Sequence, residues 1–177
     1  MKPPERFLTS RLVLRKPSIE DASGIFREYA QDPAVTKYLV WRPHRSIEET
    51  NTFLEQCLRN WEGGHDFAWV IESKEKAALM GMIGLRLEQT GANLGYVLAV
   101  PFWNQGIMTE AVAALADCAL DQESIFRVWA VTDVENGGSA RVLQKAGMKC
   151  EGILRRWIVL PNISSEPRDC YCYAKTR

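Results

Sequence analysis

Hydrophobic and polar positions follow two different periods along the chain, and together these periods predict a mixed α/β domain. Residues 11–15 form a short β-type run, and residues 19–29 then carry apolar side chains at three- and four-residue steps, which predicts a helix. Ser18, followed three residues later by an acidic side chain, gives this helix a capping signature. The same signature at Ser46 opens a second helix, which we expect to end at the glycine pair 63–64.

The middle of the chain changes to short runs rich in β-branched and aromatic residues. Runs 67–73, 80–88 and 94–100, separated by charged or glycine-containing turns, predict an antiparallel meander. An apolar stripe from Met108 to Ala119 predicts a long helix. The remaining elements that we expect are a strand at 127–132, a helix at 136–146, and strands at 149–160 and 169–174.

This order predicts one α/β (mixed α+β) domain over residues 1–177. We expect a central, mostly antiparallel, twisted sheet of about seven strands, flanked by about four helices. One connection, over residues 94–132, runs from strand to helix to strand, so one pair of strands should be parallel. The length of 177 residues and the hydrophobic share of 46% are ordinary for a single globular domain.

Charge and composition argue against several classes of function. The 22 basic side chains balance 22 acidic ones, so no net field draws the protein to nucleic acid or to an anionic membrane. The five cysteines are odd in number and lack a C-x-x-C pair, which favours a reducing compartment. The charged, proline-containing start does not have the apolar run of a signal peptide, and no later window approaches the ~20 apolar residues of a membrane span. We therefore expect a soluble, cytoplasmic protein.

The most informative segment joins the strand ending at Val100 to the long helix. Its turn contains Asn104 and Gly106, and the helix begins within a few residues. Unpaired N–H groups and the positive end of the helix dipole favour an anion there, and a phosphate group is the natural occupant. Gly106 would allow a close approach to the backbone. The segment is equally consistent with a plain strand-to-helix turn, and the glycine motifs of nucleoside triphosphate and dinucleotide sites are absent.

A second segment, from Asn136 to Met148, has residues typical of the two ends of a helix. Asn136 can cap the helix and Gly147 can end it, so these two residues alone need no functional role.

Considered together, the motifs of this chain resemble those of the GCN5-related N-acetyltransferases (GNAT family), in particular the ribosomal-protein N-terminal acetyltransferases. The resemblance covers nearly the whole chain. Its motifs are R-L-x-L-R at 11–15, P-x-x-x-D-A at 17–22, G-Y-x-L-x-x-x-x-W-x-Q-G-x-x-T-E-A at 95–111, N-x-x-S-x-x-V-x-x-K-A-G-M at 136–148 and E-G-x-L-R at 151–155.

The resemblance implies a GNAT-like fold whose parallel strands splay apart, and direct attack of a primary amine on acetyl-CoA with no metal site. Ser139 corresponds to a serine proposed in some members to protonate the departing thiolate. The residues implied to bind acetyl-CoA are Leu98 and Val100 beside the pantetheine arm, Trp103, Asn104, Gln105, Gly106, Ile107, Met108 and Thr109 in the pyrophosphate loop, and Asn136, whose side chain touches the arm.

Two residues that many family members use in catalysis are replaced here. Leu143 stands where many members have a tyrosine acid, and Asn93 where relatives often have a glutamate. Glu88, at a neighbouring strand end, is the remaining candidate base, although a solvated charge at a turn is the simpler interpretation. Trp41 and His44 lie on the loop that edges the acceptor site in this family; the alternative for His44 is a surface histidine without a role.

Three functions therefore stay open at this point. The first is acetylation of a protein or peptide N-terminal amine. The second keeps acetyl-CoA but takes a small amine such as a polyamine, an amino acid or an antibiotic. The third, suggested by the missing tyrosine and glutamate, is a non-catalytic acyl-CoA-binding or sensing domain. A monomer or a homodimer is compatible with each of them.

Overall fold

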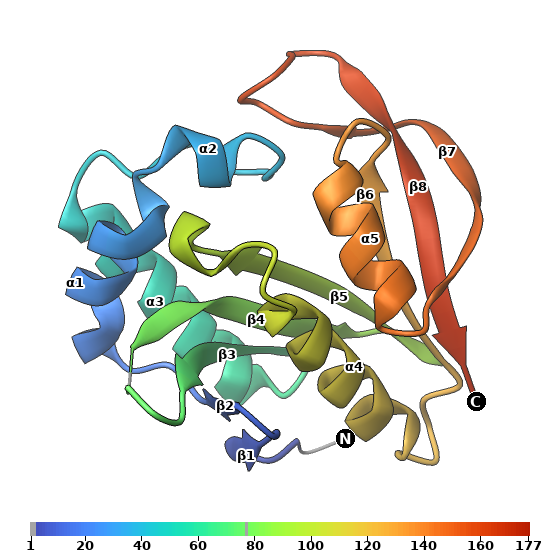
Figure 1. Cartoon of the computed structure of the whole chain (residues 1–177), viewed down its shortest axis with the longest axis horizontal. Helices are drawn as coiled ribbons and strands as arrows, with labels where there is room; N and C mark the ends of the chain where they lie inside the picture. Colours follow the sequence, from blue (N-terminus) through green and yellow to red (C-terminus); the bar gives the residue numbers. More distant parts are fainter. Residues whose placement is uncertain (1–2, 77) are drawn as a thin grey trace.

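One eight-stranded sheet forms the centre of the computed structural model, which describes residues 3–76 and 78–177 (Figure 1). Met1 and Lys2, part of the charged start considered above, lie outside the described residues, as does Ala77. The strands are β1 (Arg6–Leu8), β2 (Leu12–Arg15), β3 (Asp66–Ser73), β4 (Leu79–Leu87), β5 (Gly91–Leu98), β6 (Arg127–Asp133), β7 (Lys149–Val159) and β8 (Pro167–Thr176). Their order across the sheet is β1-β2-β3-β4-β5-β6-β8-β7.

The parallel pair lies at the centre of the sheet and is short. β5 pairs with β6 over three residues, Gly91–Asn93 against Arg127–Trp129, whereas the other pairings between the described strands are antiparallel. Beyond Asn93, β5 remains paired with β4 as far as Leu98, and β6 remains paired with β8 as far as Asp133. The two strands therefore part, and in Figure 1 β6 runs behind α5 while β5 runs away from it across the centre of the view.

Helices cover both faces of the sheet. They are α1 (Ala22–Ile25), α2 (Pro33–Thr36), α3 (Ile47–Gly63), α4 (Ile107–Leu120) and α5 (Gly137–Lys145), together with the short helical turns η1 (Ile19–Asp21), η2 (Phe26–Ala30) and η3 (Val100–Phe102). Alternate residues of the strands point to opposite faces. Trp69 and Ile83 accordingly pack in the cluster that contains α4, whereas Val70 and Met82 pack with α1 and α3.

The predicted class and sheet are confirmed, with some differences in the elements. The helix expected at residues 19–29 is divided into η1, α1 and the wider turn η2. Two additional elements, β1 and α2, have three and four residues, which is too short to produce a clear period. The expected strand 94–100 ends at Leu98, and Val100 lies in η3. Pro101 explains this end, because proline has no N–H to donate to a strand ladder.

Among the described helices, none combines the length and the apolar character needed to span a bilayer.

Two glycines in the central strands allow a test of how closely β4 and β5 approach. A Cβ built on Gly81 would lie 2.2 Å from the carbonyl oxygen of Val97, whereas a Cβ on Gly95 meets nothing within 4 Å. We expect Gly81→Ala to lower the free energy of unfolding by about 2 kcal/mol or more, because backbone atoms must move. The matched control, Gly95→Ala, should change it by well under half as much. Urea unfolding at pH 7 measures both, and equal stabilities of the two variants would contradict this packing.

Candidate active site

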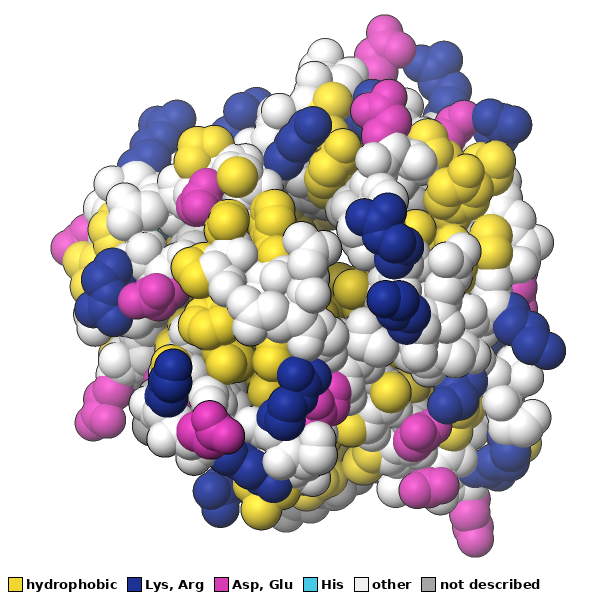
Figure 2. All heavy atoms as spheres, viewed as in Figure 1, with side chains coloured by type: hydrophobic (Ala, Val, Ile, Leu, Met, Phe, Trp, Pro, Cys, Tyr) yellow, Lys and Arg dark blue, Asp and Glu magenta, His cyan; other side chains and the backbone are white. Residues whose placement is uncertain are grey.

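A cleft of about 1100 Å³ opens where β5 and β6 part. Its walls come from β4, β5, the loop before α4, the end of β6, α5, the α2 region and the tip of the β7–β8 hairpin. Figure 2 shows the central hollow, with basic side chains lying over α5 at its side. Arg141 and Lys145 of α5 are the basic residues of that wall.

Most of the residues that the sequence assigned to acetyl-CoA are brought together in this cleft. The cleft lining includes Leu98, Trp103, Asn104, Gly106, Ile107, Met108, Thr109 and Asn136, and also the candidate acid Ser139. Gln105 lies in the same loop, where its side-chain amide donates to the carbonyl oxygen of Pro101 at 2.7 Å. Val100 lies in the η3 turn, 40% exposed, beside the cleft rather than at the end of the strand.

Two left-handed residues shape the loop before α4. Asn104 has φ of 59° and Gly106, the N-cap of α4, has φ of 73°. The first helical hydrogen bond runs from Glu110 N–H to the Gly106 carbonyl at 3.0 Å, so the N–H groups of the preceding turn have no partner within the helix. Because the positive end of the dipole adds to these donors, the loop is suited to an anionic group.

An ion pair from the start of the sheet holds this loop in place. Glu110 accepts hydrogen bonds from Thr9 Oγ1 at 2.5 Å and from the Arg11 N–H at 2.8 Å, and its Oε2 pairs with Arg11 Nε at 2.7 Å. Arg11 also donates to the carbonyl oxygen of Gln105 at 3.0 Å. Burial acts to raise the pKa of Glu110, but the hydrogen bonds from Thr9 and Arg11 outweigh it and lower this pKa to about 2. The carboxylate therefore stays ionised, with its charge compensated by Arg11.

The backbone donors of β5 alternate between β4 and the cleft. Ala99 N–H donates to the Met80 carbonyl in β4 at 2.9 Å. Since successive residues of a strand point their backbone groups to opposite sides, the N–H groups of Tyr96 and Leu98 point toward the open side. The carbonyl oxygen of Leu98, on that side, accepts a hydrogen bond from Trp103 Nε1 at 2.7 Å.

The N-terminus of α5 contributes a serine and its neighbours to the cleft. Asn136 Oδ1 accepts from the Ser139 N–H at 3.1 Å, which is an ordinary N-cap. The Tyr96 hydroxyl lies 2.7 Å from Ser139 Oγ and 3.3 Å from the Ser139 carbonyl oxygen. Tyr96 is not among the site residues predicted from the sequence. The alternation of side chains along a strand predicts that Tyr96 lies on the same face of β5 as Leu94 and Leu98. The sequence does not predict its distance to Ser139.

Leu143, where many family members have a tyrosine, is fully buried in the core cluster that contains α4. Asn93, in contrast, lines the cleft, where its side-chain amide lies 3.5 Å from the carbonyl oxygen of Trp129.

The structure does not bring Glu88 into the cleft. Its carboxylate accepts a hydrogen bond from the Trp129 indole N–H at 3.2 Å, in the turn before β5 and therefore at the paired end of the β5–β6 junction. The Glu88 carboxylate is therefore held by the Trp129 indole, away from the segment where β5 and β6 separate.

Trp41 and His44 line a separate cavity of about 40 Å³ with Tyr29 and Phe53. His44 Nδ1 lies 2.8 Å from Thr50 Oγ1. Burial lowers the pKa of His44 below its ordinary value, against a smaller opposite effect of a neighbouring carboxylate. His44 is therefore neutral near pH 7, and in the loop between α2 and α3 its ring lies against those of Trp41 and Phe53. Val97 lines both this cavity and the main cleft.

Two polar connections frame the mouth of the cleft at the end of β6. Arg168 pairs with the buried Asp133 at 2.6 Å and with Glu135 at 2.9 Å. Burial acts to raise the pKa of Asp133, but the hydrogen bond from Arg168 lowers it overall. Asn162 donates from Nδ2 to the carbonyl oxygens of Thr36 and Trp41, each at 2.7 Å, so the β7–β8 connection is tied to the loop around α2.

Within the part of the chain that the structure describes, no group of three or more metal-ligating side chains is close enough to hold a metal ion.

Comparison with known proteins agrees with this geometry. A family model described as an acetyltransferase (GNAT) domain matches residues 11–149. A relative from Bacillus licheniformis, the uncharacterized N-acetyltransferase p20, is 30% identical over 154 residues, which are 85% of this chain and 86% of the relative.

Solved structures share the fold. The microcin C7 self-immunity acetyltransferase MccE, in complex with acetyl-CoA and AMP, has a TM-score of 0.86 at 22% identity, over 96% of this chain and 94% of that one. The ribosomal L7/L12 α-N-protein acetyltransferase RimL, in complex with coenzyme A, has a TM-score of 0.85 at 22% identity, over 96% of each chain.

The Arg11–Glu110 pair predicts a specific dependence of stability on pH. Because the pKa of Glu110 is lowered from 4.5 to about 2 on folding, its contribution is fully present above pH 4.5 and is lost as pH falls through 2. We expect Glu110→Gln to lower the free energy of unfolding by about 2 kcal/mol at pH 7, with a smaller difference from the wild type at pH 3.

Denaturant unfolding at the two pH values measures this difference, and Glu123→Gln, at an exposed position, is the control. A Glu110→Gln deficit that is the same at pH 3 as at pH 7 would count against the ionised pair.

Proposed function

The chain belongs to the acetyltransferase (GNAT) family, and on this basis we propose that it transfers the acetyl group of acetyl-CoA directly to the α-amino group of a protein or peptide. Acetyl-CoA-dependent N-acetylation is the activity of the family; the kind of acceptor and the residues that act are our proposal. The observation that carries it is the position of the anion-binding loop at the mouth of the same cleft into which β5 turns its free N–H groups.

The donor occupies the cleft along its whole length in this proposal. The N–H groups of residues 105–109 bind the pyrophosphate, and Arg141 and Lys145 place compensating charge along the same wall. The pantetheine arm lies between the parted strands, where the open-side groups of β5 replace the hydrogen bonds that β6 no longer makes. Asn136 and Ser139 then face the thioester end of the arm.

The chemical step needs a neutral amine, donors for the oxyanion and an acid near the sulfur. The Leu98 N–H, which points to the open side of β5, is our candidate donor for the tetrahedral oxyanion. Ser139 is our candidate acid for the thiolate. The amine nitrogen bonds to the carbonyl carbon, the C–S bond breaks, and the sulfur takes a proton from Ser139. The proton of the amine leaves to solvent, and a proton that reaches Ser139 from solvent restores its hydroxyl group.

Neither Glu88 nor His44, the two side chains considered for accepting or relaying the proton of the amine, lines the cleft. An α-amino acceptor fits such a cleft because it loses its proton more easily than a lysine amine. An α-amino group has a pKa near ~8 and a lysine amine near ~10.4, so the α-amino group costs about 3 kcal/mol less to deprotonate. Water is then a sufficient base.

A panel of amines tests the acceptor. The panel contains a peptide with a free N-terminus, the same peptide blocked at its N-terminus but carrying a lysine, and a polyamine, with thiol release measured at saturating acetyl-CoA. We expect the free peptide to react at least tenfold faster, with a rate that rises through pH ~8 as its α-amino group loses its proton. Faster reaction of the blocked peptide or of the polyamine would replace the proposed acceptor by a side-chain or small amine.

Gly106 tests the pyrophosphate loop. Gly106→Glu places an anionic side chain where phosphate is proposed to bind, in a left-handed backbone conformation, and we expect at least a hundredfold loss of acetyl-CoA affinity by calorimetry. Gly106→Asn is the matched control, since asparagine tolerates that conformation without adding charge. Circular dichroism checks that both variants fold. A folded Gly106→Glu variant with affinity equal to that of Gly106→Asn would contradict the loop assignment.

A further inference from the structure

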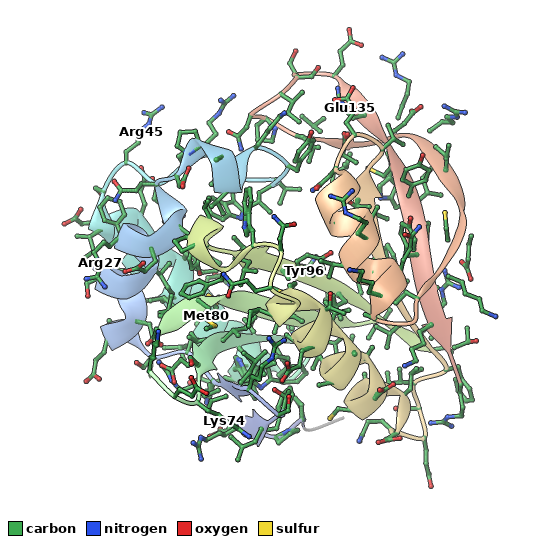
Figure 3. All side chains as sticks on the ribbon, in the orientation of Figure 1. Arg27, Arg45, Lys74, Met80, Tyr96 and Glu135 are labelled. Atoms are coloured by element: carbon green, nitrogen blue, oxygen red, sulfur yellow. The ribbon has the colours of Figure 1, made fainter. Side chains whose placement is uncertain are left out.

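The hydroxyl groups of Tyr96 and Ser139 form a pair in the cleft that the sequence motifs do not explain. Tyr96 belongs to β5, and Ser139 belongs to the first turn of α5, so the pair joins two walls of the cleft. Their oxygen atoms are 2.7 Å apart, and both residues line the cleft. Figure 3 shows Tyr96 between β5 and α5, in the centre of the molecule.

The geometry gives this pair a direction. The Tyr96 oxygen also lies 3.3 Å from the Ser139 carbonyl oxygen, which can only accept a hydrogen bond. The phenol has a single proton, and Ser139 Oγ at 2.7 Å is nearer to it than the Ser139 carbonyl oxygen, so we assign the Tyr96 proton to the bond with Ser139 Oγ. Burial raises the pKa of Tyr96 to about 12, so the phenol keeps its proton at neutral pH. With its oxygen accepting from Tyr96, Ser139 has its own hydroxyl proton free to point elsewhere in the cleft.

We propose that Tyr96 is a positioning residue for the acid step: by donating to Ser139 Oγ, it aims the serine proton at the thioester sulfur and replaces that proton as it leaves. This inference rests on the proposed role of Ser139. As the C–S bond breaks, the sulfur takes the hydroxyl proton of Ser139, and Ser139 takes the proton of Tyr96. Solvent, which has received the proton of the attacking amine, returns one to Tyr96, so charges and protons balance.

The position of Leu143 explains why the donor comes from the sheet. Leu143 has no hydroxyl group and is fully buried within the core cluster, so α5 offers the cleft no hydroxyl at this position. Tyr96 reaches the same helix from the opposite wall. Its ring packs against the core cluster while its hydroxyl meets Ser139, so the ring is supported and the hydroxyl has a fixed location. A phenol whose ring is fixed by packing loses little conformational entropy when its hydroxyl group donates to a neighbouring side chain.

The chain contains a matched control for this hydroxyl. Tyr173 of β8 also reaches α5, where its hydroxyl accepts a hydrogen bond from Gln144 Nε2 at 3.1 Å. Tyr173 packs in the same core cluster as α4 but lies outside the cleft lining. Tyr96→Phe and Tyr173→Phe therefore each remove one hydroxyl that bonds to α5 from the sheet, and only the first removes a neighbour of Ser139.

The experiment is a double-mutant cycle of Tyr96→Phe and Ser139→Ala, with Tyr173→Phe as the control. For each variant, kcat and KM for acetyl-CoA are measured with whichever amine the wild type accepts best, and thiol release is measured without amine, where water is the acceptor. Thermal unfolding measures structural damage. We expect Tyr96→Phe to lower kcat about tenfold with KM within twofold, Tyr173→Phe to leave both within twofold, and the double variant to match Ser139→Ala.

Three results would overturn the inference. One is a kcat for Tyr96→Phe equal to that of Tyr173→Phe. The second is a Tyr96→Phe effect that persists undiminished in the Ser139→Ala background, because Tyr96 would then act independently of the serine. The third is an unchanged kcat for Ser139→Ala. Failure of the acceptor proposal is distinguishable from all three results. A different acceptor changes only which amine reacts, whereas thiol release without amine still measures the acid step.

Discussion

The early end of the parallel pairing between β5 and β6 is the constraint on which the site depends. After Asn93 the N–H and C=O groups on one side of β5 face away from β4 without a strand beside them. Backbone groups inside a protein require partners, and an open strand edge at the centre of a sheet is a ready place to bind an extended molecule. The side chain of Trp103 satisfies one carbonyl there, and the acyl donor is proposed to satisfy others.

Polar contacts fix the elements on both sides of the gap between β5 and β6. Arg11 and Glu110 fix the loop before α4 to the start of the sheet, so that the N-terminus of the helix faces the cleft. On the other side, Arg168 holds the end of β6 against β8 through the buried Asp133. Tyr96 and Ser139 bridge the two walls at the level where the thioester is proposed to lie. Each of these polar contacts joins segments that are remote in sequence, and each lies at the border of the cleft or within it.

Local sequence patterns predict many of the helices and strands that form the cleft. The periods predicted the meander, the long helix and the order of the later strands, and the strand–loop–helix junction with Gly106 predicted an anion site. The motifs indicated the family, which the family model confirms, whereas their assignment of acetyl-CoA to the loop stays a prediction. Short elements such as α2 were missed because four residues do not show a period. Val100 was assigned to a strand because its residue type favours one, whereas the next residue, Pro101, ends the ladder.

Long-range contacts were the part that sequence patterns could not supply. Glu88 was considered as a base because it lies at a strand end, yet its partner, Trp129, lies 41 residues away and holds it at the paired end of the junction. Tyr96 was passed over because its significance comes from its distance to Ser139, 43 residues further along. Two hydroxyl groups on different elements form no recognisable spacing pattern in the sequence, so their proximity is known only from the fold.

The central claim, that backbone donors of the parted strand and of the α4 loop hold the acyl donor, is tested most directly by amide hydrogen exchange with and without coenzyme A. We expect slower exchange at Tyr96, at Leu98 and at residues 105–109 when coenzyme A is bound, with little change at the amides of β5 that already bond to β4. Binding of coenzyme A that leaves those amides unchanged, or that protects another part of the chain instead, would contradict it.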